Sequence, residues 1–290
     1  MPLHKGLCNR ALIMSVGHFE YGVNLNRRPG VRKDQKKLHR ALSKLGFKVD
    51  IHTDLNSEEI YQLFMKESKR PVKDCFIAVL SSHGEDGCVF GADGKPVRLS
   101  QIFTYFDNEC MENTAKLFFI QACRGGGLDD GVEVDSVDGA EENFSLDLLV
   151  PIDTAVMYAT APGKAFHNIS LLLCAFVSIP NTLLPLGYAA FTHPCGSVFL
   201  QTFCKLLEED GNRNMELTRL MTRLCHRVAY TFQAKGRDFS GKRQMPCLLS
   251  RMTREVYPFA EAGKDTGVLG LSASAMISTE NVSDSMPSIS

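Results

Sequence analysis

The chain alternates short apolar runs, each the length of a β-strand, with amphipathic stretches of helical period. The apolar runs occur at residues 11–16, 48–53, 75–80, 116–120, 155–160 and 247–252, and the helical stretches at residues 31–45, 56–64, 99–106, 197–209 and 215–232. Strands separated by helices predict a mostly parallel sheet that is covered on both faces. At 290 residues and 44% hydrophobic, the chain suffices for one large α/β domain.

Local signals sharpen several of these boundaries. Gly46 is expected to end the helix that begins near Val31, and Asn56 is expected to open the next one. The glycine-rich segment 87–94 predicts a tight hairpin.

Composition excludes several function classes. The net charge is −1 and no basic stripe is apparent in the sequence, so binding to nucleic acid is not expected. The amino terminus lacks the pattern of a secretory signal, which predicts a cytoplasmic protein.

The ten cysteines are scattered singly, without a Cys-x-x-Cys or His-x-x-x-His pair, and are expected to be reduced core thiols. Neither a metal nor a cofactor is predicted.

Two apolar runs end in residues that carry chemistry. Residues 116–120 lead to Gln121 and Cys123, and residues 75–80 lead to His83 and Gly84. Because neighbouring parallel strands lie about 5 Å apart, the thiol and the imidazole could meet at the carboxyl edge of the sheet. This is the geometry that a cysteine nucleophile needs.

The pentapeptide Gln121-Ala122-Cys123-Arg124-Gly125, with a histidine upstream, is the local signature of caspases. The chain resembles this family from about residue 8 to residue 259. The resemblance implies a caspase-like α/β fold with a largely parallel six-stranded sheet. It also implies a cysteine endopeptidase that cleaves protein substrates after aspartate, in acidic motifs, and acts in apoptosis.

The resemblance assigns roles to the residues of the motif. Cys123 attacks the scissile carbonyl to form a thioester, and His83 donates the proton that lets the amine leave. The backbone N–H groups of Gly84 and Cys123 form the oxyanion hole. Each residue alone also has a more common structural interpretation: an inert core cysteine, a hydrogen-bonded core histidine or a loop glycine. The occurrence of all three together makes the catalytic interpretation the better one.

The substrate pocket matches the family only in part. The resemblance places Arg28 and Gln121 around the substrate carboxylate, although Arg28 alone could be an arginine on a solvated loop. Ala190 and Phe191 correspond to the loop that frames the substrate, and Thr192 stands where the family has a second arginine. Loss of that arginine predicts aspartate binding that is either weaker or rebuilt from other residues, for which His193 is a candidate.

A further departure is an insertion of 24 residues, 164–187, which interrupts the family's continuous substrate loop. Its apolar length approaches that of a membrane span, but Pro180, Asn181 and Pro185 interrupt it, so no membrane segment is expected. We interpret the insertion as a translated retained intron.

The acidic stretch after the pentapeptide predicts an exposed linker that proteases can reach. Cleavage is expected after Asp135, with Asp138 as a second candidate. The implied organisation is a large subunit (residues 1–135), a linker (136–153), a small subunit (154–259) and a disordered tail (260–290). The short segment before the first strand predicts an executioner type that an upstream protease activates and that forms a dimer of large and small subunit pairs.

Two functions are consistent with these patterns. One is an active aspartate-directed cysteine endopeptidase, which the intact His83 and Cys123 motifs favour. The alternative is a catalytically impaired caspase-like splice form or decoy that binds active caspases, which Thr192 and the insertion favour.

Overall fold

The structure is a computed structural model, and it describes residues 7–122, 150–160, 192–231 and 244–260. A six-stranded sheet forms its centre, in the order β11-β8-β7-β3-β1-β2. The strands are β1 (Arg10–Ser15), β2 (Lys48–Thr53), β3 (Cys75–Ser81), β7 (Ala115–Gln121), β8 (Thr154–Tyr158) and β11 (Cys247–Ser250). All neighbours pair in parallel except β11, which runs antiparallel to β8. The predicted largely parallel six-stranded sheet is confirmed.

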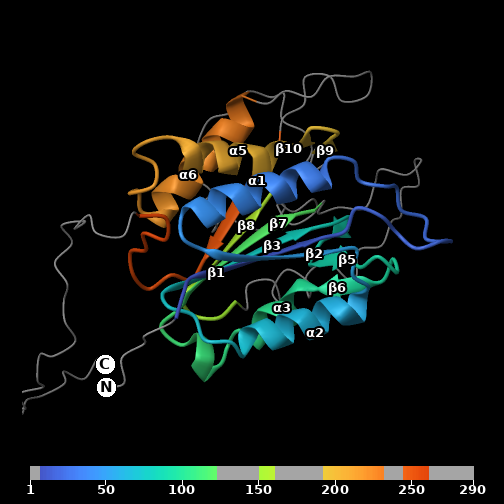
Figure 1. Ribbon diagram of the computed structural model, residues 1–290, viewed down its shortest axis with the longest axis horizontal. Helices are drawn as coiled ribbons and strands as arrows, with labels where there is room; N and C mark the ends of the chain where they lie inside the picture. The colour runs from blue at the N-terminus through green and yellow to red at the C-terminus, as the bar shows by residue number, and fades with distance from the viewer. Residues whose placement is uncertain (1–6, 123–149, 161–191, 232–243, 261–290) are drawn as a thin grey trace, which may run out of the picture.

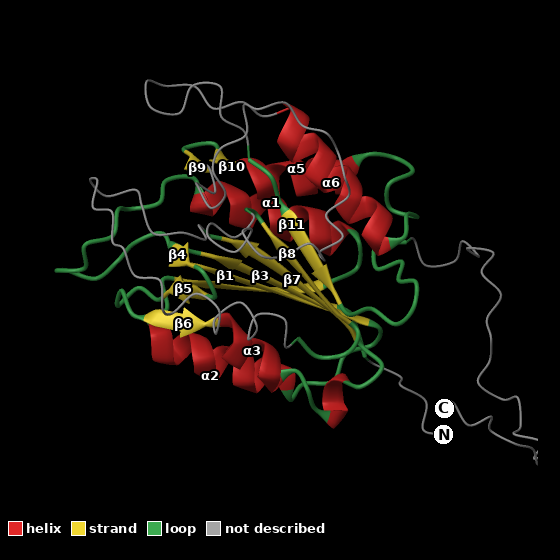
Figure 2. Ribbon diagram, turned by 180° about the vertical axis from the view of Figure 1, so that it is seen from behind, coloured by secondary structure: helices red, strands yellow, loops and turns green. Residues whose placement is uncertain are grey.

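Helices cover both faces of the sheet, as Figures 1 and 2 show. One face carries α1 (Val31–Lys44), α5 (Val198–Glu208) and α6 (Leu217–Thr231), and the other carries α2 (Ser57–Ser68) and α3 (Leu99–Tyr105). A short 3-10 helix, η1 (Glu109–Met111), precedes β7. The expected α/β class and the expected helices are confirmed.

The hydrophobic core consists of two layers, one on each side of the sheet. In the first layer Phe119 of β7 packs against Phe203 of α5, with ring centroids 4.4 Å apart. In the second layer Phe118 of β7 packs against Phe103 of α3, with ring centroids 4.9 Å apart. Because β7 contributes a fully buried aromatic ring to each layer, its position in the middle of the fold is fixed from both sides.

The two helix boundaries predicted from single residues are borne out. Asn56 caps α2 by accepting a hydrogen bond from the backbone of Glu59, and the Glu59 side chain accepts one from the backbone of Asn56. The α1 helix ends at Lys44, and Gly46 follows with a φ of 83°, a left-handed conformation that favours glycine.

Two small sheets lie outside the central one. The first is an antiparallel sheet of β4 (Gly84–Glu85), β5 (Cys88–Phe90) and β6 (Pro96–Arg98). The predicted single hairpin at residues 87–94 is therefore corrected to two successive hairpins, because the strand at Gly84 is too short to have a sequence pattern. The second small sheet pairs β9 (Thr192–His193) with β10 (Gly196–Ser197).

In the described ranges, no helix combines the length and apolar character needed to cross a bilayer. Nor do three or more His, Cys, Asp or Glu side chains of those ranges gather as a metal site would require.

Candidate active site

The ends of β3 and β7 lie side by side at the carboxyl edge of the sheet. Ser81 and Gln121 are register partners, and the backbone N–H of Ser82 donates a hydrogen bond to the carbonyl of Gln121 over 3.2 Å. His83 directly follows this bonded pair on one strand, and Ala122 follows it on the other. The structure thus brings the two motifs together where the sequence predicts a nucleophile and its base to meet. Cys123 itself lies outside the described residues.

The His83 ring is oriented by two contacts. Its Nε2 lies 2.7 Å from the backbone carbonyl oxygen of Asn26, and its ring centroid lies 5.3 Å from that of Phe19. A carbonyl oxygen only accepts hydrogen bonds, so Nε2 is the protonated nitrogen. In the neutral ring Nδ1 is then the basic nitrogen, which is the state that a general base requires.

The backbone around His83 is held by Phe90 of the neighbouring hairpin. The N–H of Phe90 donates to the His83 carbonyl over 2.9 Å, and the Ser82 hydroxyl donates to the Phe90 carbonyl over 2.6 Å. The next residue, Gly84, is buried and pairs with Val89 in the small sheet. The histidine loop is therefore a rigid part of the fold before any substrate arrives.

Arg28 is buried between two strand ends. Only 5% of the residue is exposed, and its guanidinium donates to the Val16 carbonyl over 2.7 Å and to the Ser81 hydroxyl over 2.9 Å. The alternative of an arginine on a solvated loop is therefore wrong. Ser81 is also the register partner of Gln121, so Arg28 is bonded to the residue beside the predicted second pocket residue.

Gln121 is fully buried, with 0% exposed. Neither its amide nitrogen nor its amide oxygen has a hydrogen-bond partner among the described residues. A buried polar group without a partner costs about 1–3 kcal/mol, and such groups are rare in folded proteins. A buried amide without a described partner is what a pocket for a polar ligand group would contain.

Asp34 connects the two halves of the chain near this site. Its buried carboxylate accepts a hydrogen bond from the backbone N–H of Ser197, at the start of α5, over 2.9 Å, and one from the Gln201 side chain over 2.6 Å. Burial raises the pKa of this carboxyl, although the hydrogen bonds from Gln201 and Ser197 and the charge of Arg28 oppose the rise. Asp34 thereby fixes the amino-terminal ends of α1 and α5 to each other.

Two of the described cysteines have the properties of inert core thiols. Burial raises the pKa of Cys75, and burial raises the pKa of Cys204 to about 12. A thiol in that state is not a nucleophile at neutral pH. The predicted core role is confirmed for these two residues.

Several predicted site residues cannot be placed. Cys123, Asp135, Asp138, Ala190 and Phe191 lie outside the described residues, as does the 164–187 insertion. Thr192 begins β9, and its backbone pairs with Ser197 at the start of α5.

Sequence reasoning missed three contributors to the site. Asn26 contributes only its backbone carbonyl, so its side chain carries no signal. Ser81 precedes the motif of His83 and could have been found by asking which hydroxyl follows the same buried strand. Asp34 is the single acid in a basic helix, and that contrast was a usable signal.

Comparisons with known proteins agree with this arrangement. The chain matches the family described as "Caspase domain" over residues 8–257. It is 33% identical to caspase-3 of Bos taurus over 260 residues, which cover 87% of this chain and 84% of that protein. It is 30% identical to caspase-7 of Gallus gallus over 259 residues, covering 86% of this chain and 76% of that protein.

A solved structure extends the similarity to three dimensions. The crystal structure of caspase-1 from Spodoptera frugiperda superimposes with a TM-score of 0.67 at 25% identity, covering 88% of this chain and 93% of the other. Sequence and fold agree over nearly the same span. This chain therefore belongs to the caspase family of cysteine-type endopeptidases, on the executioner-like side of that family.

Proposed function

We propose that this chain cleaves protein substrates after aspartate, with Cys123 as the nucleophile and His83 as the general acid and base. The observation that carries this proposal is that buried Arg28 is bonded to Ser81, the register partner of Gln121, and that the buried Gln121 amide has no hydrogen-bond partner among the described residues. A guanidinium and a neutral amide in a desolvated site suit a carboxylate, which accepts up to four hydrogen bonds.

The chemistry divides into two steps. The Cys123 thiolate attacks the backbone carbonyl carbon of the substrate aspartate, and the N–H groups of Gly84 and Cys123 stabilise the oxyanion. Collapse breaks the C–N bond, His83 protonates the departing amine, and a thioester remains. Water, deprotonated by His83, then hydrolyses the thioester and regenerates the thiol.

Activation is proposed to occur by cleavage after Asp135, with Asp138 as the second candidate. The large subunit would comprise residues 1–135 and the small subunit residues 154–259, and the active form would be a cytoplasmic dimer of such pairs. In support, β7 and β8 are adjacent in the sheet, so the two parts remain paired when the segment between them is cut. Asp135→Ala should remove the large fragment seen by mass spectrometry, whereas Asp138→Ala should not.

The activity is tested with a panel of acidic tetrapeptide substrates. The chain as given, the chain without residues 164–187, and Cys123→Ala are assayed in parallel. Hydrolysis after aspartate that is lost in Cys123→Ala supports the proposal, and its absence from every form refutes it.

A second candidate function is a catalytically impaired form that binds active caspases. The observation that favours it is the sequence itself, where Thr192 replaces the family arginine and 24 residues interrupt the substrate loop. Activity only after deletion of residues 164–187 would identify the chain as a defective splice form. Genomic sequence without splice boundaries at residues 163 and 187 would refute the retained intron.

A further inference from the structure

The exposed side of α1 carries five cations, Arg32, Lys33, Lys36, Arg40 and Lys44, which we call the basic face. In the part of the chain that the structure describes, no ion pair involves any of the five; the Lys33 ammonium lies 3.9 Å from the Cys195 sulfur. The expectation that the protein has no basic stripe is therefore wrong. A net charge of −1 conceals the basic face because the acids that balance it lie elsewhere in the sequence.

The placement of these charges is unfavourable for the helix itself. Arg32, Lys36, Arg40 and Lys44 follow one another at intervals of four residues, so each faces a like charge on the next turn. Arg32 and Lys33 also lie in the first turn, where the helix dipole disfavours cations. An anionic partner bound to the basic face would therefore reduce the repulsion among its cations.

Acids on the elements around α1 do not neutralise the basic face. Asp34 points inward to Ser197, and Asp50 of β2 lies 3.6 Å from Arg70. Asp54 accepts hydrogen bonds from the backbone of Gly17 and from His18. Glu208 at the end of α5 forms no ion pair with α1 within the described ranges.

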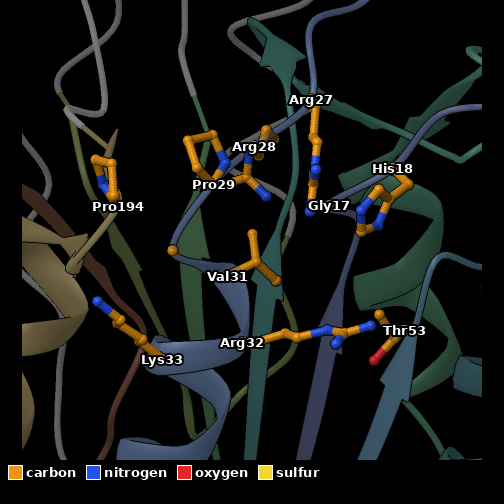
Figure 3. Close-up of a pocket in the computed structure, with 11 residues that line it drawn as sticks. Gly17, His18, Arg27, Arg28, Pro29, Val31, Arg32, Lys33, Thr53 and Pro194 are labelled. Carbon is orange, nitrogen blue, oxygen red and sulfur yellow. The ribbon is translucent and has the colours of Figure 1, made fainter.

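The basic face begins beside the candidate active site. A cavity of about 190 Å³ at the amino end of α1 is lined by Arg27, Arg32 and Lys33 among others, and Figure 3 shows these three side chains arranged around Val31. Arg27 directly follows Asn26, whose carbonyl holds His83. Arg28 of the proposed substrate pocket lines the same cavity, so the basic face adjoins that pocket. Figure 1 shows α1 lying across the layer above the sheet.

We propose that the basic face is a docking surface for acidic polypeptide, through which protein substrates with an acidic segment are recruited. Charge complementarity identifies the class of partner: residues 129–142 of this chain contain seven acids and no Lys or Arg, and the same segment of a second copy has the required chemistry. Nucleic acid is the weaker fit, because α1 has no Phe, Tyr or Trp on which a base could stack. The recruitment of substrates rests on the proposed protease function, whereas the binding itself does not.

The binding test uses the full chain carrying Cys123→Ala and a fluorescent peptide with the sequence of residues 127–144. The test variant is Lys36→Glu with Lys44→Glu, two exposed positions outside the cavity, which converts the like-charge pairs along α1 into opposite-charge pairs. The matched control is Lys66→Glu with Lys69→Glu, two exposed lysines of the α2 region on the other face of the sheet.

Fluorescence anisotropy should show the dissociation constant rising about tenfold or more in the test variant and less than about twofold in the control, since two attractions become repulsions only in the former. Binding should also weaken as salt rises from 0.05 to 0.3 M, values chosen to shorten the Debye length. Equal weakening in both variants would overturn the proposal. Tighter binding of a single-stranded oligonucleotide of equal charge, lost in the same variant, would also overturn it in favour of nucleic acid.

A kinetic test separates this inference from the proposed activity. The test variant should hydrolyse a tetrapeptide as the parent does, because a tetrapeptide is too short to reach along α1. It should cleave an acidic protein substrate, the Cys123→Ala copy of this chain, about tenfold more slowly at low substrate concentration. If no form hydrolyses the tetrapeptide, the proposed activity fails, and the anisotropy result still decides the docking surface.

Discussion

Replacing Arg28 with lysine tests whether a fixed guanidinium, rather than a positive charge, is needed at the end of β3. The substitution keeps the charge but removes the planar fork. Among the described residues, the Arg28 guanidinium donates hydrogen bonds to the carbonyl of Val16, just after β1, over 2.7 Å and to the hydroxyl of Ser81, at the end of β3, over 2.9 Å. A lysine ammonium is a point donor and can replace only one of them at full strength.

The magnitude follows from that geometry. A hydrogen bond made by a charged group contributes about 1.5–3 kcal/mol, so the free energy of unfolding should fall by roughly that amount. If the same guanidinium binds the substrate aspartate, the displaced charge should lower kcat/KM by about ten- to a hundredfold, beyond the fraction lost to unfolding.

Arg27→Lys is the matched control, because Arg27 is the adjacent arginine, is exposed and has no partner among the described residues. Urea denaturation at pH 7 and kcat/KM for an acidic tetrapeptide are measured for both variants in the most active form of the chain. The control should change the free energy of unfolding by less than about 0.5 kcal/mol.

Two results would contradict the reasoning. Equal effects of the two lysine substitutions would show that the hydrogen bonds of Arg28 contribute nothing. A loss of stability with unchanged kcat/KM would show that Arg28 braces the strand ends without binding substrate.

Three further predictions concern the fold. Phe203→Ala, which removes a fully buried ring with neighbouring aromatic centroids at 4.4 and 5.8 Å, should lower the free energy of unfolding by about 3–5 kcal/mol in urea titrations, whereas Tyr21→Ala at an exposed position should have almost no effect. Burial raises the pKa of Asp54, but its hydrogen bonds with Gly17 and His18 outweigh that effect and the net pKa is lowered. The ionised carboxylate therefore stabilises the folded state above the ordinary carboxyl pKa, and this stabilisation is lost as pH falls through the folded value. The difference in free energy of unfolding between the parent and Asp54→Asn should accordingly shrink below about pH 4. Because burial raises the pKa of Cys204 to about 12, iodoacetamide at pH 8 should label the exposed Cys110 and leave Cys204 unlabelled in the folded protein, as mass spectrometry of the digested protein would show.

The sequence predicted the central sheet well because its strands have a strong local signal. The buried runs ending at Ser81 and Gln121 are apolar throughout, and such runs are typical of parallel strands covered on both sides. Strand β4 and the β9–β10 pair escaped prediction because two residues are too few to show a period.

The sequence predicted those site residues whose side chains carry the chemistry. It did not predict those that contribute only a backbone group. Arg28 was predicted from its motif, but its burial depends on strand ends that come together only in the fold. The Asn26 carbonyl that orients His83 has no counterpart in residue type, since every residue has a carbonyl.

The basic face shows a different limit of the sequence. Its cations alternate with the buried residues of α1, so a linear count mixes Arg32 and Lys36 with Asp34 and Gln35. Only the helical period separates an exposed row of charge from an apolar inner side.

The ladder between β7 and β8 also determines what a cut in the chain does to folding. Its five register pairs, from Lys116 with Thr154 to Ile120 with Tyr158, join two strands that lie on either side of the acidic stretch 129–142 in the sequence. A single cut anywhere between them leaves the folded sheet in place but makes its reassembly a reaction between two molecules. Recovery after unfolding then depends on protein concentration. An intact chain can refold in dilute solution, whereas the two fragments of a cut chain separate when they unfold and do not reassemble at low concentration. Cleavage would therefore also determine how long the folded protein persists.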